Sequence, residues 1–105
     1  MKAAALTPVF AALGDDTRWA ILSRLGQGPA SASALARELP VSRQAIVKHL
    51  ELLREVGLVE AEQVGRELVH RPIGSRLNDV ARQLERIGSA WDDRLASIKR
   101  LAEEG

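Results

Sequence analysis

Cysteine is absent from this chain of 105 residues, and histidine occurs only twice. The absence of cysteine excludes disulfides, thiolate metal sites and cysteine nucleophiles, and it is typical of a cytoplasmic protein. A metal site made from histidine would need both rings at one ion, together with further donors. His49 and His70 fall in separate predicted elements. We therefore expect no bound metal and no other cofactor.

Neither charge of one sign nor a long apolar run dominates the sequence. The formal net charge is +1, so any strongly charged surface must arise from the placement of side chains and not from composition. The apolar run near the N-terminus is interrupted by Thr7 and Pro8 and is far too short to span a membrane. We read it as a first helix and not as a signal peptide, and we expect no membrane partner.

Residues that would support catalysis are also missing. Asp92 and Asp93 are adjacent in a predicted helix, so their side chains point about 100° apart and cannot share a substrate. Ser31 and Ser33 lack the histidine and acidic partners that activate a nucleophile, and helix capping explains them better. We therefore predict that the chain is not an enzyme.

The stretch 42–57, SRQAIVKHLELLREVG, predicts a short helix with a defined start and end. Ser42 can cap its first turn, and Gly57 follows the last periodic residue, where a left-handed residue is common. Its apolar stripe consists of Ile46, Leu50 and Leu53. The opposite face carries Arg, Gln and Lys, which are the side chains that pair with guanine and adenine edges in the major groove.

Three helices are expected ahead of this stretch. Thr7 and Pro8 predict the start of the first, over 7–14, and 15–17 begins a second. Ser31 or Ser33 can cap a third, which Pro40 ends. The third and fourth helices, joined by about three residues, form a helix-turn-helix over 31–57.

Residues 58–73 predict a β-hairpin directly after the helix-turn-helix. The segments LVEAEQ and ELVHRPI flank a turn that contains Gly65, and Pro72 lies at the far end, where a strand tolerates proline. A hairpin in this place is the wing of a winged helix. Arg66 would lie at its tip.

A long helix is predicted over 75–104. Its apolar residues step by three or four: Leu77, Val80, Leu84, Ile87, Trp91, Leu95, Ile98 and Leu101. Roughly 28 residues of helix extend about 42 Å, which one small domain cannot cover. We therefore expect this seam to pair with the seam of a second copy. Trp19 and Trp91 both lie on apolar stripes, and we expect them in core or dimer packing and not in a ligand cage.

The predicted fold is a single domain spanning 1–105, mainly α with a small β-hairpin. It is a winged helix-turn-helix with a long C-terminal dimerisation helix, and 7–14 and 75–104 are the two helices expected to dimerise. No internal repeat, linker or low-complexity segment divides it.

The chain resembles the ArsR/SmtB family of winged-helix transcriptional repressors. The matching segments are FAALGDDTRWAILSRL, LARELPVSRQAIVKHLELLREVGLV and VGRELVHR, followed by WDDRL in the closing helix. The most specific part is 35–59. The resemblance implies a homodimer that binds double-stranded operator DNA and represses a promoter, with its first and last helices at the dimer interface.

Two departures from the family pattern bear on metal sensing. Metal-sensing members carry two cysteines, one residue apart, at positions that match Ser31 and Ser33 here. Other members place histidine and acidic ligands on the last helix, and this last helix has no histidine. The chain is therefore similar to a metal-independent branch, and the resemblance implies no particular effector.

We expect a sequence-specific transcriptional repressor, acting on its own or a neighbouring promoter without a metal effector. The residues expected to contact DNA are Ser42, Arg43, Gln44, Val47, Lys48, His49 and Arg66. Those expected at the dimer interface are Phe10, Leu13, Leu77, Leu84, Ile87, Trp91, Leu95 and Ile98.

Several alternatives stay open on the sequence alone. A protein-interaction module with little DNA binding would also suit the balanced charge. His49 and His70 could each be a DNA contact, or simply solvated or packed. Arg18 could lock the second helix to its neighbours or face the DNA backbone. Arg37 and Arg54 could contact phosphates or pair with nearby glutamates.

Overall fold

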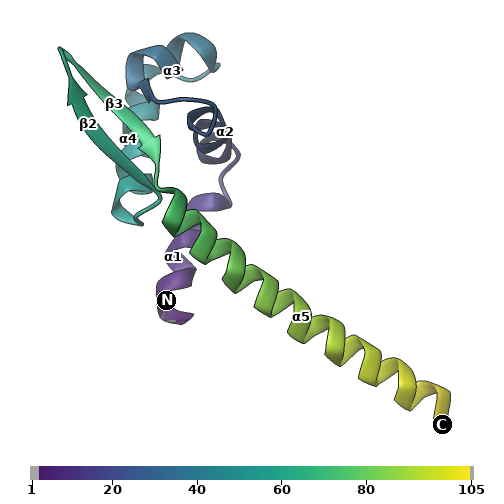
Figure 1. Ribbon diagram of the computed structural model, residues 1–105. Helices are drawn as coiled ribbons and strands as arrows, with labels where there is room; N and C mark the ends of the chain where they lie inside the picture. Colours follow the sequence, from purple (N-terminus) through teal and green to yellow (C-terminus); the bar gives the residue numbers. More distant parts are fainter. Residues whose placement is uncertain (1–2, 105) are drawn as a thin grey trace.

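The computed structural model of the chain describes residues 3–104, except for the side chains of 3–7, 90, 91 and 104. The predicted class, mainly helical with a small hairpin, is confirmed (Figure 1). In chain order the elements are α1 (Ala3–Leu13), α2 (Asp16–Leu25), β1 (Ala30–Ser31), α3 (Ala32–Glu38), α4 (Arg43–Glu55), β2 (Val59–Val64), β3 (Glu67–Pro72) and α5 (Gly74–Glu104).

Local capping chemistry fixes the ends of the helices around the helix-turn-helix. The side chains of Asp15, Ser31 and Ser42 each accept a hydrogen bond from the backbone N–H three residues on, at 3.0, 3.1 and 3.2 Å. Such caps satisfy N–H groups that have no partner within the helix. Gly57 after α4 has a φ of +80°, as predicted for a residue that ends a helix in the left-handed conformation.

The predicted start of the first helix is wrong. α1 begins at Ala3, and Pro8 lies inside it. Proline removes the hydrogen bond of its own N–H, but the three alanines at the start of α1 have the highest helix propensity of any residue. The helix therefore extends upstream of the proline.

The sheet has three strands in the order β1–β3–β2, all antiparallel. β1 was not predicted, because its two residues are too short to show an alternating pattern. In the hairpin, Val64 pairs with Glu67 across a two-residue loop. Gly65 has a φ of +63° and Arg66 does not have a positive φ, which is the pattern of a type II′ turn.

The core lies between α2, α3, α4 and the base of the hairpin. Its most buried side chains are Val9, Ile21, Leu25, Leu35, Ile46, Leu50, Leu53 and Leu58. Trp19 is not among them, because 57% of its surface is exposed in the single chain. Of the two predicted roles for Trp19, core packing is excluded and dimer packing stays a prediction. α2 buries Ile21, Leu22 and Leu25, and Trp19 lies at the edge of that stripe, where the single chain leaves it uncovered.

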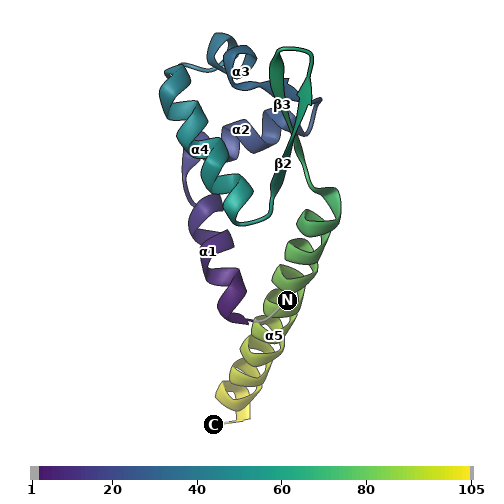
Figure 2. The same ribbon diagram turned by 90° about the vertical axis from the view of Figure 1, so that its left-hand side faces the viewer.

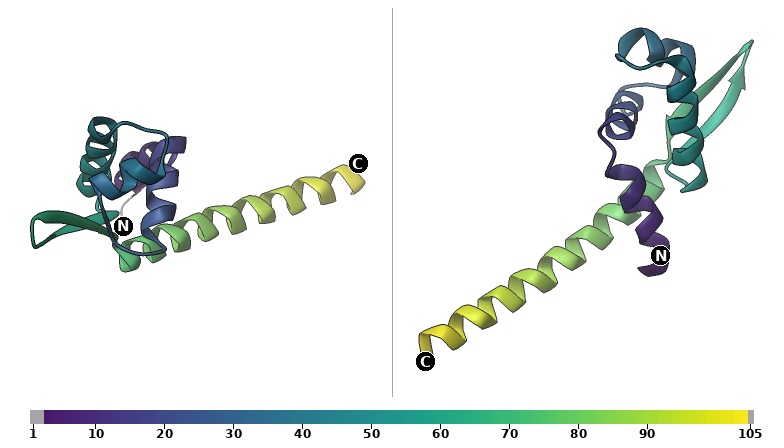
Figure 3. Two further views of the ribbon diagram at one scale, coloured as in Figure 1. Left: turned by 90° about the horizontal axis from the view of Figure 1, so that it is seen from above. Right: turned by 180° about the vertical axis from the view of Figure 1, so that it is seen from behind.

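α5 leaves the winged domain and projects away from it as one long helix (Figures 1 and 3). Val80 in its first turns is 3% exposed and belongs to the core. Farther along, the apolar residues Leu84, Ile87, Leu95 and Ile98 are 44–60% exposed. The side chain of Trp91 lies outside the described residues. Across residues 3–104, no helix is both long and apolar enough to cross a membrane.

Both predicted dimerisation helices extend from the same end of the winged domain, opposite the wing tip (Figure 2). Phe10 and Leu13 of α1 are half-buried, and Leu13 packs against the core. Leu77, at the start of α5, also packs there. The single chain therefore covers Leu13 and Leu77 in part and leaves the distal seam of α5 open.

Candidate nucleic-acid interface

The outer face of α4 presents polar and basic side chains beyond a buried seam. Ile46, Leu50 and Leu53 are at most 1% exposed, and they hold the helix against α2 and α3. Gln44 and Lys48, one turn apart on the other side, are exposed. The structure therefore has the outward face that the sequence predicted for a recognition helix.

The first turn of α4 is held to α3. Ser42 is the exposed cap, and Arg43 donates a hydrogen bond from Nε to Oγ of Ser33 at 3.0 Å. Arg43 is exposed, and Val47, one turn on, is half-buried. Both side chains line a groove between α4 and the wing. The contact to Ser33 fixes the direction of the Arg43 guanidinium, which was not evident from the sequence.

Arg66 lies in the two-residue loop at the tip of the hairpin, between the paired residues Val64 and Glu67. Gln63 supports the loop, because its Nε2 donates to the carbonyl oxygen of Gly65 at 3.1 Å. Arg66 is exposed. It makes no ion pair with any residue that the structure describes, so its charge is available to a partner.

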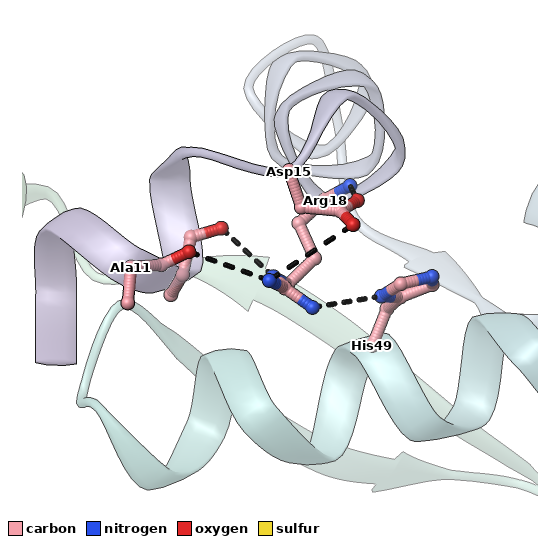
Figure 4. A network of polar contacts seen from close by, with 5 residues as sticks. Ala11, Asp15, Arg18 and His49 are labelled. Atoms are coloured by element: carbon pink, nitrogen blue, oxygen red, sulfur yellow. Dashed lines mark hydrogen bonds and ion pairs between the residues drawn. The ribbon is translucent and has the colours of Figure 1, made fainter.

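Arg18 of α2 joins three helices, as Figure 4 shows. Its Nε donates to the carbonyl of Ala12 at 2.8 Å and its Nη2 to that of Ala11 at 3.3 Å, both at the end of α1. Its Nη1 lies 3.3 Å from Nδ1 of His49 in α4. Arg18 therefore locks α2 to its neighbours, which was one of the two interpretations left open by the sequence.

Asp15 completes the network from the N-cap of α2. Its carboxylate accepts from the backbone N–H of Arg18, and this bond is the largest cause that lowers the pKa of Asp15. The Arg18 guanidinium, 4.0 Å away, lowers it further. The carboxylate therefore stays charged and helps to orient the arginine.

His49 does not lie on the outer face where the sequence analysis placed it. Positions 46, 49, 50 and 53 share one side of a helix with a 3.6-residue repeat, and that side packs inward. His49 is half-buried with Nδ1 turned towards Arg18. Because an arginine side chain only donates, Nδ1 is the acceptor in this contact.

His70 is also packed, at 5% exposure, in β3 beside β1. Burial lowers the pKa of His70, and the positive charge of Arg54 lowers it further, against an opposing effect of the nearby Ala30 backbone. Glu38, a possible partner of Arg37 by sequence, instead pairs with Arg24 and ties α3 to α2. In the described part of the chain, no cluster of three potential metal ligands is present.

A helix-turn-helix with a polar, basic outer face, followed by a hairpin with an arginine at its tip, defines a winged helix DNA-binding domain. The protein-family model described as a helix-turn-helix domain matches residues 13–62 of the chain. The chain is 60% identical to an ArsR-like transcriptional regulator from Rhodococcus sp. RHA1, over 94% of this chain and 93% of that one, with a TM-score of 0.82. The chain belongs to the ArsR family of winged-helix transcriptional regulators.

Two further relatives agree with this assignment. The HTH-type transcriptional regulator Rv2034 of Mycobacterium tuberculosis is 45% identical over 60 residues, or 57% of this chain and 56% of its own length. The homodimeric winged helix-turn-helix domain of Mb0332 from Mycobacterium bovis, a possible ArsR-family regulator, is 30% identical. The aligned region covers 84% of this chain and 79% of the Mb0332 domain, with a TM-score of 0.65. These relatives are transcriptional regulators and not enzymes, as expected for this chain.

Proposed function

We propose that the protein is a homodimeric repressor that binds operator DNA through α4 and the wing and needs no metal effector. The observation that carries this proposal is the display of Gln44 and Lys48 on a helix whose opposite side is fully buried. An amide and an ammonium group one turn apart suit readout of base edges in the major groove. Arg66 suits the adjacent minor groove or the phosphate backbone.

The distribution of apolar surface favours DNA over a protein-docking role for α4. Among the described side chains, the exposed large apolar residues lie on α2, the hairpin and α5, and none lies on α4. Val47, which could have served a docking module, is half-buried. The alternative role as an interaction module therefore lacks an apolar docking surface on the recognition helix.

The distal seam of α5 supports the homodimer. Leu84, Ile87, Leu95 and Ile98 leave a continuous apolar stripe open to solvent on the single chain, and such stripes usually mark an interface. A parallel or antiparallel pairing of the same stripe from a second copy would cover it. A dimer would present two recognition helices to two half-sites, about 34 Å apart on one face of the DNA.

The positions that match metal ligands elsewhere in the family support independence from metal. Ser31 Oγ is occupied as the cap of α3, and Ser33 Oγ accepts from Arg43. Both are neutral hydroxyl groups, which are poor ligands for zinc or softer ions. Their observed hydrogen bonds assign them roles in holding the helix-turn-helix together.

The affinity of the chain for its own promoter DNA, measured across a series of salt concentrations, tests this function. We expect binding with a steep negative salt dependence, because phosphate contacts release counterions. A protein-interaction module would show little DNA binding at any of these concentrations, and that result would refute the proposal.

A further inference from the structure

A groove of about 400 Å³ lies between the recognition helix and the wing. Its walls come from β1, the start of α3, α4, the hairpin loop at Arg66 and the strand β3. The volume falls in the range of small-molecule sites, which are commonly 300–1,000 Å³. None of the DNA contacts proposed above requires a cavity of this kind, so the groove needs a separate explanation.

His70 lines this groove from β3, and only 5% of the residue is exposed. Its Nδ1 is fully buried and has no surface open to the groove. A ligand in the groove would therefore lie against the His70 ring without bonding to this nitrogen.

The charges around the groove favour a ligand with anionic oxygens. Three guanidinium groups, of Arg43, Arg54 and Arg66, line it against two carboxylates, of Glu51 and Glu67. Arg54 and Arg66 form no ion pair within residues 3–104. Guanidinium groups bind carboxylate and phosphate oxygens in pairs, and such charge-assisted bonds are the strong ones.

The rest of the wall is apolar or bears a hydroxyl group. Val47 and Leu68 face the groove from opposite sides, one from α4 and one from β3. Leu68 is 43% exposed in the single chain, so a ligand with an apolar body would cover part of it. Ser33 adds a hydroxyl group near Arg43.

We propose that this groove binds a small organic anion, with a carboxylate or phosphate group held by Arg54 beside the His70 ring and a short apolar body between Val47 and Leu68. Arg43, Val47 and Arg66 belong both to this wall and to the proposed DNA face. An occupant therefore changes the presentation of the recognition helix relative to the wing. By linkage, the ligand and DNA alter each other's affinity by the same factor.

Ligand binding is tested first on the full chain without DNA, so that its failure is separable from a failure of the proposed function. Phenyl phosphate and benzoate are titrated into protein with ¹⁵N-labelled histidine, and benzyl alcohol is the neutral control. We expect saturable binding of at least one anion, with the His70 ring nitrogens shifting and those of His49 much less affected. Even a weak site with a Kd of about 1 mM would be close to saturated at roughly 10 mM anion. Failure of both anions to show saturation up to this concentration would overturn the proposal.

Matched variants locate the ligand. Arg54→Ala removes an exposed side chain and should keep the fold, as circular dichroism would verify, while weakening the anion about tenfold or more. Arg37→Ala removes another exposed arginine, on α3, that does not line the groove, and this variant should bind the anion like wild type. Equal affinity of wild type and Arg54→Ala would overturn the proposal. Ser33→Ala, at the other end of the groove, should weaken binding of the anion by a smaller factor.

A DNA backbone phosphate carries the same oxygens as the proposed ligand, so it could also occupy the groove. Binding measurements with the small anion and DNA, separately and together, distinguish these two occupants. We expect the small anion at saturation to change the affinity for promoter DNA by about fivefold or more, within the common range of allosteric coupling. If DNA alone shifted the His70 ring and neither small anion did, the groove would be a phosphate seat and the proposal would be wrong. Anion binding without any change in DNA affinity would refute the coupling.

Discussion

Nη1 of Arg18 lies 3.3 Å from Nδ1 of His49, so α2 contacts the middle of the recognition helix α4 directly. The same guanidinium holds two carbonyl groups at the end of α1. The position of α4 is thereby linked to a helix proposed to form the dimer interface. One half-buried side chain, 18% exposed, makes this connection.

Arg18→Ala should lower the free energy of unfolding by about 1–3 kcal/mol, because it leaves His49 Nδ1 and two backbone carbonyls without their donor. Arg18→Lys should recover only part of the loss, since an ammonium group cannot span the three acceptors as the planar fork does. Urea denaturation measures both changes. Arg86→Ala, at an exposed position in α5, is the control and should change stability little. Wild-type stability in Arg18→Ala would show that the network is incidental.

Stability should also depend on pH through His70. Burial lowers the pKa of its folded-state imidazole below the usual value of 6.5, so on acidification the unfolded chain takes up a proton before the folded chain does. The group therefore favours folding above pH 6.5, and that contribution is lost as the pH falls from 6.5 towards the folded-state pKa. The slope cannot exceed about 1.4 kcal/mol per pH unit for one proton.

Urea denaturation between pH 5 and 8 compares wild type with His70→Phe. Wild-type stability should fall towards lower pH across this range, and the variant should show a flatter profile whatever its absolute stability. His49 and the carboxylates are present in both proteins and cancel in the comparison. Parallel profiles would mean that His70 is protonated equally easily in both states.

The dimer proposal predicts that one charge on the α5 seam separates the subunits. Leu95→Glu places a carboxylate on the stripe, where Leu95 is 51% exposed in the single chain. We expect sedimentation at micromolar concentration to give a dimer for wild type and a monomer for the variant. Ser89→Glu adds the same charge about 120° away from Leu95 around the helix and should remain dimeric. A monomeric wild type would refute the dimer.

Metal ions should leave DNA binding unchanged. Promoter affinity is measured with a chelator and then with stoichiometric Zn²⁺, Ni²⁺, Co²⁺ or Cd²⁺ at micromolar concentration. We expect equal affinities, because Ser31 and Ser33 are neutral and already hydrogen bonded. A tenfold change with any ion, about 1.4 kcal/mol of coupling, would reveal a metal site and contradict the proposal.

The features predicted correctly from the sequence depend on nearby residues. The start of the second helix within 15–17, the cap at Ser42, the glycine after α4 and the loop at Gly65 follow from the chemistry of a few adjacent positions. Apolar periodicity likewise gave the buried face of α4 and the long seam of α5, because one helix contains the whole pattern.

The features that were missed depend on contacts between distant segments. β1 exists only because Ala30 pairs with His70, forty residues farther along the chain. The contact of His49 with Arg18 joins two different helices, so neither local pattern indicates it. Trp19 is exposed because no other element of the single chain covers it. The groove beside the wing is lined by several elements that are far apart in the sequence, so no local pattern could indicate it.

Sequence discrimination by the recognition helix tests the central claim most directly. The affinities of wild type, Gln44→Ala and Arg66→Ala are measured for the native promoter and for a scrambled DNA at one salt concentration. Gln44→Ala should lose about 1–3 kcal/mol on the promoter and little on scrambled DNA, because it removes a base-edge contact. Arg66→Ala should weaken both DNAs to a similar degree. An unchanged ratio of promoter to scrambled affinity in Gln44→Ala would contradict the assignment of this face of α4 to DNA.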